Sequence, residues 1–178
     1  MSDATSADSR ALIEMALGDL EREMNATERV LKRVPEDELD WRPHERSWTL
    51  GELAAHVANL LSWAKRAIED DEYDMAAPGS VGGKRPESTD EILDTFYGLK
   101  ADVVKALGDT DDATMSEPWT LRQGDRELFT LPKAAVLRTW SLSHMIHHRG
   151  QLTVYLRLLD VAVPPTYGPT ADEKLGLD

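Results

Sequence analysis

The chain has 178 residues, of which 41% are apolar and 30% charged, a balance typical of a folded domain rather than of a disordered or membrane chain. Twenty basic residues stand against 33 acidic ones, and the net charge of −13 argues against nucleic acid as a partner because the average field repels phosphates. Cysteine is absent, which excludes disulfides, thiolate metal ligands and a cysteine nucleophile. Any metal ion must therefore be held by nitrogen or oxygen.

The length predicts a single domain over 1–178. Its core is expected over about residues 8–168, between a flexible N-terminus and a C-terminal tail. No apolar run is long enough to span a membrane, and the opening MSDATSADSR lacks the basic and apolar regions of a signal peptide. We therefore expect a cytoplasmic protein with no membrane partner.

Two amphipathic helices are predicted in the first half of the chain. Apolar residues at three- and four-residue spacing indicate a first helix over about Asp8–Val34. Thr49, with Glu52 three residues later, forms a capping-box pattern, which predicts that a second helix begins there and extends over about 49–74.

A third helix is expected after a segment rich in Pro, Gly and Ser, residues 78–88, which we interpret as a flexible connection. Its GSVGGKR lacks the spacing of a phosphate-binding loop. The third helix should begin at Thr89 and end at Gly108. Its buried face is predicted to consist of Ile92, Leu93, Phe96, Leu99, Val103, Val104 and Leu107.

The segment 109–130 lacks helical periodicity and is either a long loop or a short hairpin, because WTL and ELF flank the turn-like RQGDR. The fourth helix is expected to open at Leu131-Pro132 and to run to about Leu159. The tail beyond it is too rich in Pro and Gly to be helical, although Tyr167 could pack it back onto the bundle. Four long helices predict an all-α four-helix bundle, whose interior is a common place for metal sites.

Three of the chain's five histidines lie within five positions of the fourth helix. At 3.6 residues per turn, His144 and His148 stack one turn apart and can direct two nitrogens at one point. His147 lies toward the edge of the same stripe, and we interpret it as a bystander or a group that supports the ligands. The full stripe consists of Leu137, Trp140, Ser141, His144, His148, Gln151, Tyr155, Leu158 and Leu159.

A third histidine is available on the second helix, where His56 shares a face with apolar residues. A lone buried histidine usually makes hydrogen bonds within a core. Two unpartnered imidazoles on one inward stripe would cost about 1–3 kcal/mol each, which favours a divalent cation as their partner. His56, His144 and His148 therefore form the predicted metal site, and a core of hydrogen-bonded histidines is the alternative.

Two segments, RPHERSWTLGELAAHVANL and HMIHHRGQLTVYLRLLDVAVPPTYGP, resemble the DinB-like family of four-helix metalloproteins. The family pattern pairs a tryptophan-containing entry and a histidine in the second helix with H-x-x-x-H-R-G-Q in the last long helix. The matching positions are Trp48, His56, His144, His148, Arg149, Gly150 and Gln151. The resemblance extends from about the first helix to Gly168. It implies a bundle of the DinB type, zinc or nickel as the ion, a metal position open to water or substrate, and a homodimer.

An open three-histidine site permits two kinds of chemistry, hydrolysis by activated water or activation of a thiol. The resemblance slightly favours a thiol-dependent S-transferase over a hydrolase, with a low-molecular-weight thiol and a small molecule as substrates. A peptidase is disfavoured because Met145 stands where H-E-x-x-H has its general base. The alternative is a non-catalytic, metal-stabilised stress-response or binding scaffold. DNA repair, which the family's historical name suggests, is disfavoured by the charge.

The residues beside the ligands carry open interpretations. Gln151 either orients a bound water or substrate or makes a hydrogen bond between helices. Arg149 faces away from the stripe, which favours a salt bridge or a dimer contact over catalysis. Gly150 is expected to let another helix approach closely, and Tyr155 to be a packing residue.

Overall fold

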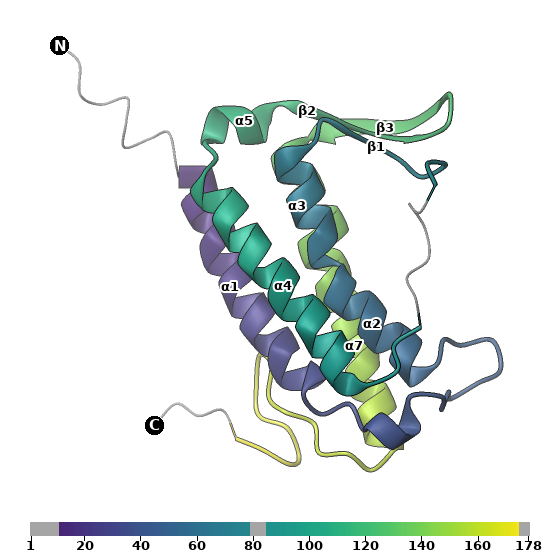
Figure 1. Cartoon of the computed structure of the whole chain (residues 1–178). Coiled ribbons are helices and arrows are strands. Elements are labelled where there is room, and N and C mark those ends of the chain that lie inside the picture. The colour runs from purple at the N-terminus through teal and green to yellow at the C-terminus, as the bar shows by residue number, and fades with distance from the viewer. Residues whose placement is uncertain (1–10, 79–84, 175–178) are drawn as a thin grey trace.

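The computed structural model describes residues 11–78 and 85–174, and its helices form an elongated bundle with a small sheet at one end (Figure 1). Helix α1 (Ala11–Leu31) ends one turn before Pro35, close to the predicted end. The predicted start at Asp8 and the flexible N-terminus lie outside the described residues. The buried face of α1 includes the predicted Leu20, Met24, Thr27, Val30 and Leu31. A short 3₁₀ turn, η2 (Glu36–Glu38), follows it.

The second predicted helix begins where its capping box indicated. The Thr49 side chain accepts a hydrogen bond from the Glu52 backbone at 3.2 Å, and the Glu52 carboxylate accepts one from the Thr49 backbone at 2.7 Å. The segment is divided into α2 (Leu50–Asn59) and α3 (Leu61–Glu69).

The predicted end of that helix near residue 74 is wrong, because Glu72–Asp74 form the strand β1. This strand pairs in parallel with β2 (Pro118–Gln123), which is distant in sequence. Hydrogen bonds to β2 replace those of a further helical turn, so tertiary pairing overrides the local pattern here.

Helix α4 (Thr89–Gly108) has the predicted bounds, and the Ser88 side chain accepts a hydrogen bond from the Glu91 backbone at its start. Most of its predicted face is buried or half-buried, but Val104 is 47% exposed, contrary to prediction. The part of the predicted flexible connection at 79–84 lies outside the described residues.

The hairpin alternative for the next segment is confirmed. Strands β2 and β3 (Arg126–Pro132) pair antiparallel across a tight turn in which Gly124 has φ of +60°, a conformation that suits glycine. A short helix that was not predicted, α5 (Asp112–Ser116), precedes them. The three-stranded sheet, in the order β1-β2-β3, corrects the purely all-α prediction to a mostly helical fold with a small sheet.

The last helix begins at Lys133, two residues later than predicted, because Leu131 and Pro132 belong to β3. It consists of α6 (Lys133–Val136), a π-helical segment η3 (Leu137–Ser143) and α7 (His144–Leu158). The wider π turn changes the face that points inward. The residues of α7 that are buried are Met145, Arg149, Leu152 and Leu156.

Leu137 and Ser141 of the predicted stripe are buried, but from His144 onward the stripe lies at the edge of the core. His144 and His148 are half-buried, Gln151 is exposed, and Leu158 is 57% exposed, which contradicts its place on an inward stripe. After the helix, the chain returns along the bundle, and Val163 is buried. No helix within the described ranges is long and apolar enough to cross a membrane.

Candidate metal centre

The structure brings together the three histidines that the sequence singled out. His56 lies on α2, while His144 is the first residue of α7 and His148 follows one turn later. One side-chain nitrogen of each lies within 4.8 Å of the others, and the Nε2 atoms of His56 and His144 are 3.5 Å apart. Two nitrogens bound to one tetrahedral zinc ion lie about 3.3 Å apart. The cluster therefore has the dimensions needed to hold a metal ion.

The environment keeps these imidazoles neutral, as metal ligands must be. Burial, followed by the charges of His148 and His144, lowers the pKa of His56 to about 4. Burial is also the largest cause that lowers the pKa of His144 and the pKa of His148. At pH 7 all three rings consequently have a nitrogen lone pair available.

Gln151 determines which nitrogen of His148 is available. Nδ1 of His148 lies 2.7 Å from the side-chain oxygen Oε1 of Gln151. An amide oxygen only accepts hydrogen bonds, so Nδ1 carries the hydrogen and Nε2 is left with the lone pair. Both residues belong to α7, so this hydrogen bond lies within one helix and not between helices. Orientation of a bound water or substrate by Gln151 stays a prediction. Gln151 contacts one of the three candidate ligands and holds its ring in position.

Trp48 covers the histidines from the loop that precedes α2. Its ring stacks on His148 with centroids 5.6 Å apart, and it meets the His56 ring edge-on at 4.9 Å. The Tyr155 hydroxyl donates a hydrogen bond to the Trp48 backbone carbonyl at 3.3 Å. Tyr155 thus supports the wall of the site, a role that adds to the packing predicted for it.

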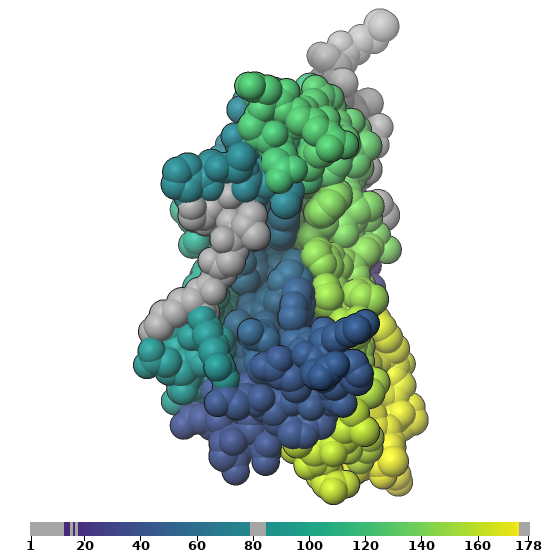
Figure 2. All heavy atoms as spheres, turned by 90° about the vertical axis from the view of Figure 1, so that its right-hand side faces the viewer, coloured from purple at the N-terminus to yellow at the C-terminus, as the bar shows by residue number. Residues whose placement is uncertain are grey.

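An open groove of about 490 Å³ begins beside His148. Figure 2 shows the face on which the loop before α2, in blue, meets the last helix, in light green. The groove is lined by Arg46, Ser47, Trp48, Leu53, His148, Gln151, Val154 and Tyr155. Within the described residues, no fourth His, Asp or Glu joins the histidine cluster. A metal ion held there would keep a position for a molecule that enters from the groove.

The other residues of the segment 147–151 have separate roles. His147 is exposed and contacts the His148 ring, with centroids 4.8 Å apart. Gly150 faces open space, so the prediction of a close helix approach is wrong. Arg149 points into the bundle and forms a buried salt bridge of 2.7 Å with Glu23 of α1, which confirms the salt-bridge interpretation.

Glu23 was not predicted as a buried residue, although its position on the apolar side of α1 indicates burial. Glu23 lies next to Met24 on the side of α1 that packs into the bundle, where an unpaired carboxylate is unfavourable. Its partner could have been sought in Arg149, the arginine that interrupts the apolar positions of the last helix.

Comparisons with known proteins agree with this fold. The model of the DinB family matches residues 1–174. The uncharacterized protein YrdA of Bacillus subtilis (strain 168) is 27% identical over 160 residues, which cover 89% of this chain and 90% of that protein.

Two crystal structures resemble the fold. A DinB-like protein from Bacillus cereus ATCC 10987 has a TM-score of 0.67 at 23% identity and matches 86% of this chain and 97% of its own. The DinB-like protein YjoA from Bacillus subtilis has a TM-score of 0.66 at 18% identity, with 86% and 96% covered. Together with the family match over nearly the whole chain, these findings show that the chain belongs to the DinB family.

Proposed function

We propose that this protein is a metal-dependent enzyme that binds a divalent ion, zinc or nickel, through His56, His144 and His148 and acts on a small molecule. The observation that carries the proposal is the arrangement of the three nitrogens, which lie within 4.8 Å of one another, with His148 also lining a groove. A closed structural site would need a fourth protein ligand, and the described part of the chain offers none in the cluster.

The chain supplies the surroundings in which such an ion is useful. A divalent ion in an open site acts as a Lewis acid and lowers the pKa of a water molecule or thiol that occupies the remaining position. Gln151 orients His148, and Trp48 shields one side of the histidine rings from solvent. The groove leaves room for a substrate to approach from the side of His148.

A thiol-dependent S-transferase is the favoured reaction class, and a hydrolase is the second candidate. The first is favoured by the resemblance to the DinB-like family, in which thiol-dependent activities are characterised. The groove adds support because it combines the apolar Leu53 and Val154 with the polar Ser47 and Gln151, a lining that suits a small amphipathic molecule. The proposal includes a cytoplasmic homodimer, with no nucleic acid or membrane partner.

The first test is metal content by elemental analysis of untagged protein, for the parent and for His56→Ala and His148→Ala. We expect about one equivalent of metal in the parent and less than a tenth of that in both variants. His44→Ala is the matched control, because His44 lies exposed in the loop before α2. A parent without metal after reconstitution, or variants that retain it, would overturn the ligand assignment.

The second test separates the reaction classes on metal-loaded protein. Conjugation of a low-molecular-weight thiol to 1-chloro-2,4-dinitrobenzene reports S-transfer, and release of nitrophenol from 4-nitrophenyl acetate reports hydrolysis. We expect thiol-dependent turnover that His144→Ala abolishes and His44→Ala preserves. Metal binding without either activity would favour the non-catalytic scaffold.

A further inference from the structure

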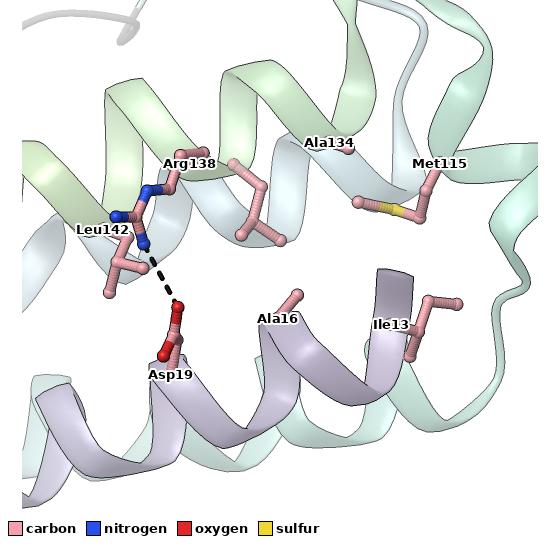
Figure 3. A pocket seen from close by; sticks show the side chains of 8 residues that line it. Ile13, Ala16, Asp19, Met115, Ala134, Arg138 and Leu142 are labelled. Atoms are coloured by element: carbon pink, nitrogen blue, oxygen red, sulfur yellow. Dashed lines mark hydrogen bonds and ion pairs between the residues drawn. The ribbon is translucent and has the colours of Figure 1, made fainter. Parts of the chain in front are cut away.

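A second cavity, of about 350 Å³, lies between α1, α5 and the beginning of the last helix (Figure 3). None of the three histidines of the candidate metal centre lines it. Its apolar wall is formed by Ile13, Ala16, Met115, Ala134, Leu137 and Leu142. A cavity of this volume and lining is within the usual range for small-molecule sites.

Small side chains and an irregular helix leave this space open. Ala16 of α1 and Ala134 of α6 both line the cavity, and their short side chains leave space between the two helices (Figure 3). Leu137 and Leu142 belong to the π-helical segment η3, a type of irregularity that is frequent at functional sites. An apolar cavity of about 150 Å³ already stays dry and accepts benzene, so this larger one has room for roughly two such rings.

A positive charge stands at the edge of the apolar wall. The Arg138 guanidinium donates to Asp19 at 3.3 Å, and its side chain is 59% exposed (Figure 3). Asp19 is engaged more closely by Arg22, at 2.8 Å. Arg22 also lies 3.6 Å from Glu23, whose carboxylate is paired with the buried Arg149.

These contacts connect the three arginines to only two carboxylates, those of Asp19 and Glu23, so the group carries one positive charge in excess. Arg138 lies at the end of this series of contacts. Within the described residues, its guanidinium makes one hydrogen bond, to Asp19. A guanidinium carries five N–H donors and binds a carboxylate through two of them. Arg138 therefore has donors for an anionic group that occupies the cavity mouth.

We propose that this cavity binds a small carboxylic acid with an apolar chain or ring system of roughly eight to ten carbon atoms. The apolar part lies between Ala16 and Ala134, and the carboxylate pairs with Arg138. This site is separate from the metal centre, and its existence does not depend on the proposed activity.

The first experiment is calorimetric titration of the full chain with straight-chain carboxylates from butanoate to dodecanoate at 0.15 M salt. We expect one equivalent to bind and the affinity to rise about fourfold per methylene until the cavity is full at eight to ten carbons. No binding of octanoate, or several equivalents with affinity that still rises at dodecanoate, would overturn the proposal.

Two variants test the position of the ligand. Ala16→Phe should fill the cavity and weaken octanoate binding at least tenfold, while Ala101→Phe on the exposed side of α4 should leave it unchanged. If Ala16→Phe does not fold, Ala134→Leu provides a smaller filling with the same expected direction. Unchanged octanoate affinity in a folded cavity-filling variant would contradict the site.

Charge and metal controls complete the test. Arg138→Gln should weaken octanoate at least tenfold and leave 1-octanol unchanged, whereas Arg126→Gln on β3 should affect neither. His148→Ala should leave octanoate binding unchanged. Loss of octanoate binding in His148→Ala alone would place the acid on the metal centre and overturn the proposal. A cavity-filling variant that changes the sedimentation mass without any octanoate effect would show a subunit contact instead.

Discussion

The immediate neighbours of the candidate histidines lower their pKa values and, for His148, determine which ring nitrogen carries the hydrogen. His56 is surrounded by the side chains of α2 and α7 and by the Trp48 ring, so burial is the main cause of its low pKa. His148 has its Nδ1 hydrogen engaged by Gln151. A neutral histidine whose Nδ1 is held by a hydrogen bond presents the lone pair of Nε2 in a fixed direction, so it can bind a metal ion without rearrangement.

The first prediction concerns the pH dependence of the metal-free protein. His56 has a pKa of about 4 in the folded protein and 6.5 as its ordinary value, so between these values the unfolded chain binds more protons. The stability that neutral His56 contributes is complete above pH 6.5 and is lost as the pH falls toward 4. We expect the Tm, measured by circular dichroism, to fall over this window.

The matched variants for this prediction are His56→Ala and His44→Ala. The loss of Tm between pH 6.5 and 4 should be smaller in His56→Ala than in the parent, and unchanged in His44→Ala, which alters an exposed loop residue. An equal loss of Tm between pH 6.5 and 4 in the parent and in His56→Ala would show that burial of His56 does not cause the pH dependence.

The second prediction concerns Gln151, which has no direct part in binding the ion. Gln151→Ala should weaken metal affinity about 10- to 100-fold, because His148 loses the hydrogen bond that fixes its ring. Competition with a chromophoric chelator measures this affinity. Gln123→Ala, at the exposed end of β2, is the control and should bind metal like the parent. Parent-like affinity in Gln151→Ala would refute the positioning role.

At the scale of elements, the π-helical segment η3 explains why the site opens to solvent. A continuous α-helix would have placed the histidine stripe over the core. The π turn instead turns Met145, Arg149 and Leu152 inward and leaves His144 and His148 at the edge, beside the groove. His148 therefore contacts His56 of α2 and lines the groove at the same time.

A second element-scale feature joins three parts of the chain. Arg149 of α7 contacts the Glu23 carboxylate, the Glu23 backbone carbonyl and Thr27 of α1. The Tyr167 hydroxyl accepts a hydrogen bond from Arg149 and donates one to Glu23 at 2.8 Å. This cluster, in which Glu23 and Arg149 are buried and Tyr167 is exposed, connects α1, α7 and the C-terminal segment.

The third prediction follows from the burial of that ion pair. Glu23→Gln should lower the free energy of unfolding by about 3–5 kcal/mol, because Arg149 is left with an uncompensated buried charge. Tyr167→Phe removes one hydroxyl and should lower it by about 1 kcal/mol. Urea denaturation measures both, and the exposed Glu21→Gln is the control.

A rescue variant gives this prediction a sharper form. Replacing both partners, Glu23→Leu with Arg149→Met, should recover part of the stability lost in Glu23→Gln, since no buried charge remains. A Glu23→Gln variant with the stability of the Glu21→Gln control would contradict the proposed contribution of the Glu23–Arg149 pair to the free energy of unfolding.

At the scale of the whole molecule, the candidate centre connects segments that are 88 residues apart in sequence, His56 on α2 and His144 on α7. An ion that binds all three histidines would hold these helices together only in the folded state. Metal binding and folding stability should therefore be linked.

The fourth prediction tests this linkage. Free metal at 100 times its Kd should stabilise the parent by about 2.7 kcal/mol, so that a chelator lowers the Tm in calorimetry. His148→Ala should show the same Tm with and without metal, and His147→Ala should respond like the parent because its ring is exposed. A metal response that His148→Ala retains would mean that the ion binds elsewhere.

The sequence by itself determined the helices with strong local signals and the histidines of the candidate centre. The capping box at Thr49 located the start of α2, and the apolar periodicity located α1 and α4. The spacing of His144 and His148 put both on one side of a helix, because helix geometry follows from local bonds.

Only the tertiary structure decided what depends on distant partners. Strand β1 exists because β2 lies beside it, and Glu23 is buried because Arg149 reaches it across the bundle. The π turn cannot be read from 3.6-residue spacing, so the histidines were predicted on the inward stripe and lie at its edge. The groove and the second cavity are spaces between elements, and such spaces form only when the helices pack.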